Sequence, residues 1–292
     1  MQRLTCMLLE CGATIHEINT LRKHLSRFSG GSLVRAAFPA TVLGLIVSDV
    51  VGDDLDVIAS GPTVPDPSTF ADCLRVVEHY GLRWKMPQSI WAHIEGGLQG
   101  RTPETPKADE PAFGRVRNVL VASVKQALEA AADEAARCGF VPHILTTAMS
   151  GEARRTAAQL VAEARRAQAG LRPGDAPLCL LAGGETTVTI RGSGKGGRNQ
   201  EMALAATLEL ADDRGIDLIC VGTDGTDGPT DAAGGYAFSG DLARLRAIGL
   251  HPKESLDAND SYPLLLKAGT LLRTGPTRTN VMDMAIMLVR PK

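Results

Sequence analysis

Residues 183–201 read GGETTVTIRGSGKGGRNQE, and residues 222–235 read GTDGTDGPTDAAGG. Twelve of the 31 glycines of the chain fall between Gly183 and Gly235. Glycine weakens helices and strands, and it is used where the backbone needs a positive φ or must approach another group closely. Because cationic and carboxylate side chains are interleaved with these glycines, the two segments together predict a site for a phosphorylated ligand and a divalent metal.

Strand-like and helix-like segments alternate around these loops, and this alternation indicates the fold class. Apolar runs predict strands at residues 118–122, 141–146, 178–182, 218–222 and 281–289. The segments between them predict helices at residues 123–138, 151–169, 199–210 and 240–248. Such an order indicates an α/β architecture with mainly parallel strands and helices on both faces. Residues 186–190 instead alternate polar and apolar side chains, which predicts an antiparallel or edge strand.

The amino-terminal part of the chain has a different organisation. Residues 1–28 read as helix, turn and helix with no strand before them, and an apolar run at residues 41–51 predicts a buried strand. Helices are predicted at residues 70–80 and 89–98, and the Pro-rich, charged stretch from Gly96 to Gly114 is typical of a linker. We therefore predict two α/β domains, residues 1–114 and 115–292, with a cleft between them and with the first domain truncated at its N-terminus.

Composition excludes several classes of protein. The chain has 292 residues, of which 44% are hydrophobic and 22% charged, as in an ordinary soluble globular protein. A net charge of −2 argues against a nucleic-acid-binding protein. No apolar run has the length of a membrane span, and residues 1–15 lack the pattern of a signal peptide. The six cysteines form no CxxC pair, so we expect no disulfides and a reducing, cytoplasmic compartment.

The glycine pattern has a dinucleotide-binding interpretation. Gly192, Gly194 and Gly197 satisfy GxGxxG, and Asp212 follows at about the distance of a ribose-binding acid. However, the preceding segment is Thr-rich, whereas a first Rossmann strand is buried on both faces, and the motif comes too late for a full nucleotide domain. A nicotinamide site is therefore the weaker interpretation.

A more local interpretation uses the same loop as an anion site. The Walker pattern fails because Gly196 follows Lys195. Backbone amides at a helix start can still form an anion-binding concavity, in which Arg198 would bind a phosphate or carboxylate. Asn199 adds a polar group to the same helical turn. The alternative is a flexible loop tip that binds nothing.

Three aspartates follow the predicted strand at residues 218–222, at the sheet edge where open α/β sheets bind ligands. Asp224, Asp227 and Asp231 do not have the spacing of an EF-hand. Magnesium needs only one or two carboxylates when a nucleotide supplies oxygens, so Asp224 is the predicted metal ligand. Asp49 follows an earlier strand in the same way. Turn chemistry is the alternative explanation for all four residues.

At these residues the chain resembles class II glycerate 2-kinases, a group often labelled hydroxypyruvate reductases. Residues 183–201, 222–234 and 275–281 resemble the MOFRL domain of that family. Residues 17–26, 45–53 and 59–67 resemble the later portion of its amino-terminal domain. The resemblance implies ATP-dependent phosphorylation of D-glycerate at its 2-hydroxyl group, with Mg²⁺, in a cleft between two α/β domains.

The resemblance also assigns roles to residues. Arg198 matches an arginine proposed to act at the active site of the family, and with Lys195 and Asp224 it forms the predicted catalytic set. The predicted substrate- and nucleotide-binding residues are Glu185, Gly194, Gly196, Gly197, Asn199, Asp49, Thr223 and Asp227.

Two departures from the family leave three hypotheses. Members of the family begin with a further α/β portion, which carries a glycine-rich loop and a lysine proposed to be catalytic, and Arg278 stands where relatives usually have glycine. By this comparison the chain starts after both groups, and the leading hypothesis is a glycerate 2-kinase homologue whose activity as truncated is left open. The others are an NAD(P)H-dependent hydroxypyruvate reductase and a non-catalytic remnant that binds a small anion or an intact relative. We expect no nucleic-acid or membrane partner, and a homodimer is among the possible assemblies.

Overall fold

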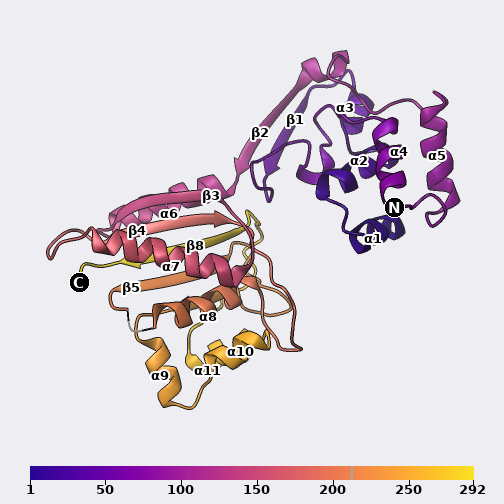
Figure 1. The fold of residues 1–292 in the computed structure, drawn as a ribbon. Helices are drawn as coiled ribbons and strands as arrows, with labels where there is room; N and C mark the ends of the chain where they lie inside the picture. Colours follow the sequence, from indigo (N-terminus) through magenta and orange to yellow (C-terminus); the bar gives the residue numbers. More distant parts are fainter. Residues whose placement is uncertain (212) are drawn as a thin grey trace. The chain divides into compact units, whose positions relative to one another are not determined.

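The computed structural model describes residues 1–211 and 213–292 and has a mixed α/β fold (Figure 1). The chain divides into two compact units. The first unit contains residues 1–46 and 53–121, and the second contains residues 47–52 and 122–292. None of the described helices is both long and apolar enough to cross a lipid bilayer.

The first unit is mainly helical. Its helices are α1 (Gln2–Glu10), α2 (Ile15–Leu25), α3 (Ser32–Ala37), α4 (Phe70–His79) and α5 (Gln88–Leu98), with short 3₁₀ turns at Ile58–Ser60 and Pro111–Arg115. Strands β1 (Val42–Val47) and β2 (Val116–Ala122) form a two-stranded sheet. Apolar side chains of α1, α2, α4 and α5 form one core, in which Leu21, Val77 and Ile94 are fully buried.

Capping boxes define where two of these helices begin. The Thr14 hydroxyl accepts a hydrogen bond from the backbone N–H of Glu17, and the Glu17 carboxylate accepts one from the Thr14 N–H at 2.8 Å. Thr69 and Asp72 form the same reciprocal pair at the start of α4. Each box satisfies two backbone groups that a helix start leaves unpaired.

The expected linker between Gly96 and Gly114 is wrong, because this segment lies inside the first unit. The Lys107 ammonium group donates to the carbonyl oxygen of Asp66 at 3.0 Å and to the Thr105 hydroxyl at 2.9 Å. Arg35 donates to the carbonyl oxygen of Glu104 at 2.9 Å. Proline and charge density indicated a flexible connection, but here the charged side chains fix the segment to its own unit.

The second unit contains a six-stranded sheet in its described part, in the order β3-β4-β8-β5-β6-β7. The strands are β3 (Val141–Met149), β4 (Leu178–Gly184), β5 (Ile216–Gly222), β6 (Gly234–Ala237), β7 (Leu271–Leu272) and β8 (Asp283–Val289). Its helices are α6 (Val124–Arg137), α7 (Ala153–Ala169), α8 (Arg198–Leu210), α9 (Asp241–Ala247), α10 (Pro252–Asp257) and α11 (Ser261–Ala268).

The predicted α/β class is confirmed, and the sheet is mixed. β3 and β4 pair in parallel, whereas β8 pairs antiparallel with both β4 and β5. β4 and β5 therefore run in the same direction, as the alternation of strands and helices predicted, but they are not neighbours. The antiparallel strand β8 lies between them.

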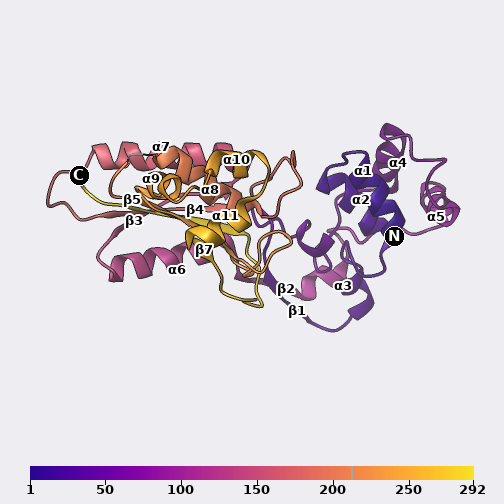
Figure 2. The same cartoon turned by 90° about the horizontal axis from the view of Figure 1, so that it is seen from below.

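Helices cover both faces of this sheet. Figure 2 shows α6 on one face and α7 and α8 on the other. The side chains of β4 alternate accordingly, because Cys179 and Leu181 pack with α6 while Leu180 and Ala182 pack in the core of α7 and α8. A strand buried on both faces reads as a continuous apolar run, and this is why residues 178–182 were recognisable from sequence.

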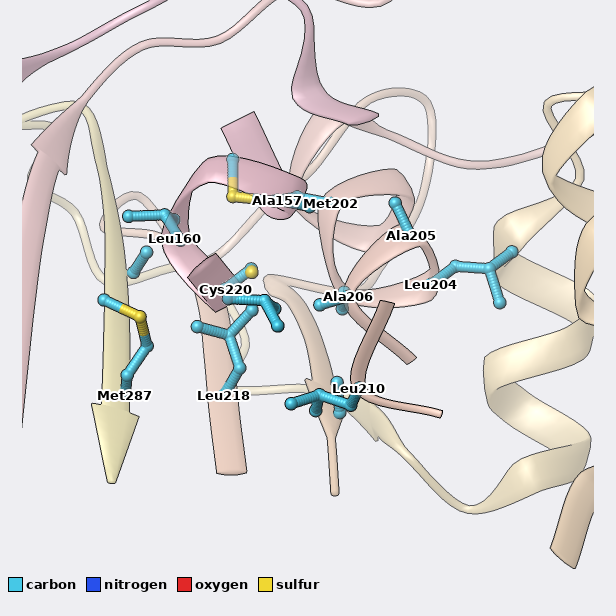
Figure 3. Close-up of a cluster of buried hydrophobic side chains, with 14 of the residues drawn as sticks. Ala157, Leu160, Met202, Leu204, Ala205, Ala206, Leu210, Leu218, Cys220 and Met287 are labelled. Atoms are coloured by element: carbon cyan, nitrogen blue, oxygen red, sulfur yellow. The ribbon is translucent and has the colours of Figure 1, made fainter. Parts of the chain in front are cut away.

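The larger core lies between the sheet and helices α7 and α8. Figure 3 shows Leu218 and Cys220 of β5 and Met287 of β8 among the buried side chains of these two helices. The buried positions Cys73, Cys179 and Cys220 agree with the interpretation of several cysteines as small core residues.

The predicted strand at residues 186–190 is wrong. Thr187 forms only an isolated bridge with Glu152, and the rest of the segment is extended chain outside the sheet. Gly184 explains the departure, since its φ of 147° and its close approach to the Met149 backbone are both unfavourable for a residue with a Cβ. The chain therefore leaves the sheet directly after β4.

The sheet core should be sensitive to cavity formation at Leu181, which is fully buried against α6. We expect Leu181→Ala to lower the free energy of unfolding by about 3 kcal/mol, because the substitution removes apolar contacts and leaves a void. Urea unfolding followed by circular dichroism measures this change. Leu266→Ala is the matched control, since Leu266 is 45% exposed and should change stability by less than about 1 kcal/mol. Equal effects at the two positions would contradict the described core.

Candidate active site

Three segments of the second unit converge at one edge of its sheet. Asp283, the first residue of β8, is the register partner of both Gly184 at the end of β4 and Gly222 at the end of β5. Glu185 follows the first glycine directly, and the segment that begins with Thr223 follows the second. The carboxyl ends of β4 and β5 therefore lie on either side of Asp283.

Arg198 is held at this edge by two carboxylates. Its Nε and Nη2 atoms donate to Asp283 Oδ2 and Oδ1 at 2.5 and 3.1 Å, and its Nη1 atom lies 2.6 Å from Glu185 Oε1. Asp283 is 1% exposed, whereas the Arg198 side chain is 35% exposed. The paired hydrogen bonds to Asp283 fix the plane of the guanidinium group, because both groups are rigid and flat.

The guanidinium group retains binding capacity. Arginine has five N–H donors, and contacts within the described chain account for three of them, so two remain for a ligand. Burial lowers the pKa of Arg198, but the hydrogen bond and charge of Asp283, with the charges of Glu185 and Asp227, raise it above the ordinary value. Arg198 is therefore a permanently charged, oriented donor at the sheet edge.

Asp227, predicted to bind the ligand, caps helix α8. Its carboxylate oxygens accept from the backbone N–H groups of Asn199 at 3.1 Å and Gln200 at 2.9 Å, and from the Gln200 side chain at 3.0 Å. All three residues are buried, and burial raises the pKa of Asp227 despite these hydrogen bonds. The first turn of α8 is thus satisfied by a protein carboxylate, and we assign Asn199 and Asp227 a structural role.

Protein atoms also occupy much of the expected anion-binding concavity. The Gly194 N–H donates to the Ala258 carbonyl oxygen at 3.1 Å, and the Lys195 N–H donates to Asp260 Oδ1 at 2.8 Å. A Cβ at Gly196 would overlap the side chain of Ser261, and one at Gly197 would overlap Asp227. These glycines are needed for close packing. Within the described residues, the amides of Gly196 and Gly197 have no hydrogen-bond partner.

Lys195 lies apart from the carboxylates around Arg198. Its ammonium group is 4.4 Å from the centre of the Tyr262 ring, at the distance of a cation–π contact. The Tyr262 hydroxyl donates to Asp231 at 2.7 Å and accepts from Arg273 at 2.7 Å. The hydrogen bond from Tyr262 lowers the pKa of Asp231, which is therefore ionised and paired within this cluster.

Thr223 and Asp224 shape the loop after β5. The Thr223 hydroxyl donates to the Met282 carbonyl oxygen at 2.6 Å and accepts from the Val281 N–H at 2.9 Å, so it joins this loop to the start of β8. Asp224 is half-buried, and its two oxygens accept from the N–H and hydroxyl groups of Thr226 at 2.9 and 3.0 Å. Asp224 thus forms a turn and keeps unused lone pairs.

Two other predicted positions are less informative. Asp49 is exposed on the segment of residues 47–52 that groups with the second unit. Asp212, the candidate ribose-binding acid, lies outside the described residues.

Arg278 adopts a φ of 64°, a left-handed conformation that glycine adopts with less strain.

No group of three or more His, Cys, Asp or Glu side chains in the described part of the chain is arranged to hold a metal by itself. The available carboxylates are Glu185, which is 47% exposed and paired with Arg198, and Asp224. This arrangement fits a magnesium ion that takes most of its ligands from phosphate and water, rather than an all-protein metal site.

A cavity of about 680 Å³ opens beside Arg198. Its walls come from residues 185–190, from the glycine loop and from Gly228 and Pro229. Glu201 also lines it and is held by Arg154 at 2.6 Å and by Asn259 at 2.9 Å. The cavity belongs to the second unit, where Arg198 and the two unpartnered glycine amides provide a cationic, hydrogen-bonding end.

Comparison with known proteins places this geometry in a family. Residues 178–283 match the MOFRL family, and residues 1–95 match a domain of unknown function, DUF4147. A glycerate kinase of Macaca fascicularis is 38% identical over the whole of this chain and 83% of its own length. The chain belongs to the MOFRL family of glycerate 2-kinases. A glycerate 2-kinase of Pyrococcus horikoshii is 47% identical over 99% of this chain.

A solved member of the glycerate 2-kinase family has the same fold. The crystal structure of glycerate kinase from Thermotoga maritima matches with a TM-score of 0.89 and 45% identity, over 99% of this chain and 67% of that one. The chain spans 64% of the length of the Pyrococcus horikoshii protein.

Sequence reasoning missed three residues of the site. Asp283 reads in the sequence only as part of an apolar strand, Tyr262 belongs to no motif, and Thr186 lies in extended chain rather than in the predicted strand. A signal existed for Asp283, because a carboxylate next to an apolar strand needs a partner if it is buried. The partner of that carboxylate lies far away in the sequence and was not predictable.

The cap on α8 provides a test of the role assigned to Asp227. We expect Asp227→Ala to lower the free energy of unfolding by about 2 kcal/mol, because two helix N–H groups and the Gln200 amide lose their acceptor. Asp224→Ala, in the same loop, is the control and should cost less, since Asp224 is half-buried and bonds only to Thr226. Chemical denaturation compares the two variants. A larger loss for Asp224→Ala would be inconsistent with the assigned cap.

Arg278 provides a test of backbone strain. We expect Arg278→Gly to raise the free energy of unfolding by about 1 kcal/mol, because glycine removes the cost of the left-handed conformation. The same replacement at Arg246 inside α9 should lower it by about 1 kcal/mol, because glycine is unfavourable within a helix. Thermal melts of both variants test this contrast, and a loss of stability for Arg278→Gly would show that strain does not dominate there.

Proposed function

We propose that the chain acts as a glycerate 2-kinase, transferring the terminal phosphoryl group of ATP to the 2-hydroxyl oxygen of D-glycerate. In this reaction the P–O bond to ADP breaks, a P–O bond to the hydroxyl oxygen forms, and the hydroxyl proton is released. The oriented and partly exposed guanidinium group of Arg198 carries the proposal. Membership of a family whose relatives are named glycerate kinases supports it.

Phosphoryl transfer needs mainly alignment and neutralisation of charge. The two remaining N–H donors of Arg198 would bind an oxyanion, either the carboxylate of D-glycerate or the phosphoryl group in transfer. Asp283 orients Arg198 and is a positioning residue, because both its oxygens are occupied by the guanidinium group. Lys195 is exposed on the glycine loop, where it would add positive charge near bound phosphates.

A magnesium ion would fit this chemistry. Asp224 would hold it, with phosphate oxygens and water completing its coordination, and Glu185 is the second candidate ligand. The ion would supply charge neutralisation on the phosphates. Arg198 and the glycine amides contribute their donors independently of the ion.

The reductase alternative receives less support from the geometry. A dinucleotide-binding loop uses its glycines to let the backbone approach a pyrophosphate. Here Gly192 and Gly194 instead pack against the backbone at Ala258, and Gly197 packs against Asp227.

Three free cysteines, Cys6, Cys11 and Cys138, are exposed, which favours a reducing compartment such as the cytoplasm. Assembly as a homodimer stays a prediction.

A coupled assay tests the proposal. The purified chain is incubated with D-glycerate, ATP and magnesium, and enolase is added to convert 2-phosphoglycerate, but not 3-phosphoglycerate, into phosphoenolpyruvate. We expect phosphoenolpyruvate to form without added mutase. A second incubation contains hydroxypyruvate and NAD(P)H, and consumption of NAD(P)H that requires hydroxypyruvate would favour the reductase. The absence of product in both incubations would overturn the kinase proposal for this chain.

Arg198 should be essential for this activity. We expect Arg198→Ala to lower kcat by about a hundredfold or more, because a charged donor aimed at the developing negative charge is lost. Arg198→Lys should recover only part of the activity, since a lysine cannot form the paired contact with Asp283. Arg166→Ala is the control, because Arg166 is exposed on α7 and pairs only with Glu163. Wild-type kinetics in Arg198→Ala would refute its role.

A further inference from the structure

The connection between α10 and α11 holds the glycine loop, residues 191–197, from one side. The N–H groups of Gly194 and Lys195 donate to Ala258 and Asp260 of this connection, and the Tyr262 N–H donates to the Lys195 carbonyl oxygen at 2.9 Å. Residues 191–197 belong to no helix or strand. The shape of the loop therefore depends on contacts with a segment that lies far away in the sequence.

The side-chain amide of Asn259 is the centre of this contact. Its Oδ1 atom accepts hydrogen bonds from the N–H groups of Arg191 at 2.7 Å and Gly192 at 3.0 Å. Its Nδ2 atom donates to Glu201 Oε2 at 2.9 Å and to the Thr189 carbonyl oxygen at 3.4 Å. An asparagine amide has two acceptor sites and two donor hydrogens, so this amide is fully used.

The Asn259 amide joins the two ends of the glycine loop. Arg191 and Gly192 begin the loop, whereas Glu201 lies in the first turn of α8, the helix that follows it. The Glu201 side chain is 3% exposed, and its other carboxylate oxygen is bound by the Nε atom of Arg154 at 2.6 Å. Glu201 is therefore a fixed point on α8, to which Asn259 ties the start of the loop.

The surroundings of Asn259 make this bridge rigid. Asn259 is 8% exposed, so water competes little for its hydrogen bonds. Its φ of 53° is a left-handed conformation, which asparagine adopts more readily than most other residues. A buried amide with all its partners in place holds the groups that it bonds at fixed distances from one another.

We propose that Asn259 is a positioning residue for the reaction, which bridges the ends of the glycine loop and so holds the loop amides in a fixed place relative to Arg198. The inference rests on the proposed kinase function, because phosphoryl transfer depends on such alignment. Protein groups occupy all four hydrogen-bonding positions of the Asn259 amide. It therefore acts through the loop and not by binding a ligand.

Limited trypsin digestion tests the bridge without reference to activity. Trypsin cleaves after Arg191, which is exposed, only when the backbone around it leaves its contacts. We expect Asn259→Ala to raise the rate of this cleavage at least about fivefold, because the start of the loop loses three hydrogen bonds. Mass spectrometry locates the cut. A rate equal to that of wild type would overturn the bridge.

Gln168→Ala is the matched control for this digestion. Gln168 is also a buried amide of the second unit, and its Nε2 atom donates to the carbonyl oxygens of Arg214 and Arg290 at 2.7 and 2.9 Å. Arg290 follows the last residue of β8, whereas Asp283 is the first, so these contacts lie at the opposite end of the strand. The variant should lose stability without faster cleavage after Arg191. Fast cleavage in both variants would overturn a specific bridge.

An exchange of donor and acceptor tests the role in turnover. Asn259→Asp keeps an acceptor for the loop but sets a second carboxylate against that of Glu201. We expect kcat to fall about tenfold or more, because repulsion between like charges displaces the loop from α8. Adding Glu201→Gln restores a donor between the two side chains and keeps an oxygen for Arg154, so kcat should return to within about threefold of wild type. A double variant as slow as Asn259→Asp, or wild-type kcat in Asn259→Asp, would overturn the proposal.

The outcomes separate this inference from the proposed function. Each kcat is measured with saturating substrates well below the Tm of the variant, so that a smaller folded fraction does not affect it. Turnover by wild type, with faster cleavage but unchanged kcat in Asn259→Ala, would overturn the positioning role and leave the kinase proposal standing. No turnover by wild type would overturn the kinase proposal and this role with it, whereas the cleavage rates would still decide whether the bridge exists.

Discussion

The pairing of β8 between β4 and β5 is the constraint on which the site depends. Asp283 lies opposite a glycine on each neighbouring strand and is almost fully buried. A buried carboxylate needs a partner, and the guanidinium group of Arg198 supplies it with two hydrogen bonds. One set of contacts thus fixes the register of the sheet, the start of helix α8 and the orientation of the predicted catalytic arginine.

The glycines of the loop serve packing as much as binding. Their density in the sequence was interpreted as a cradle for phosphate, but the connection between α10 and α11 occupies several of the amides. The loop still lines the cavity beside Arg198, and the backbone N–H groups of Gly196 and Gly197 remain available to a ligand. Close packing on one side of a loop and ligand contact on the other are compatible uses of the same residues.

Local patterns predicted most of the elements that carry the site. The helix expected at residues 199–210 begins one residue earlier, and the strands β4 and β5 were located from their apolar runs. The short strands β6 and β7 were not predicted from the sequence, because β7 has only two residues and β6 begins with two glycines. The Thr-rich segment after β4 was misassigned because period-two alternation is a local signal, while the turn at Gly184 depends on contact with β3. The roles of Asp227 and Asp283 could not be predicted, because each depends on a partner distant in the sequence.

Strand β8 follows every other described strand in the chain, although it lies in the interior of the sheet. During synthesis, β4 and β5 therefore emerge from the ribosome with apolar faces and open edges, and they cannot complete their ladders until β8 follows. Pairing across such long sequence separations is slow. The nascent second unit would spend this interval with the edges of β4 and β5 open to wrong strand partners.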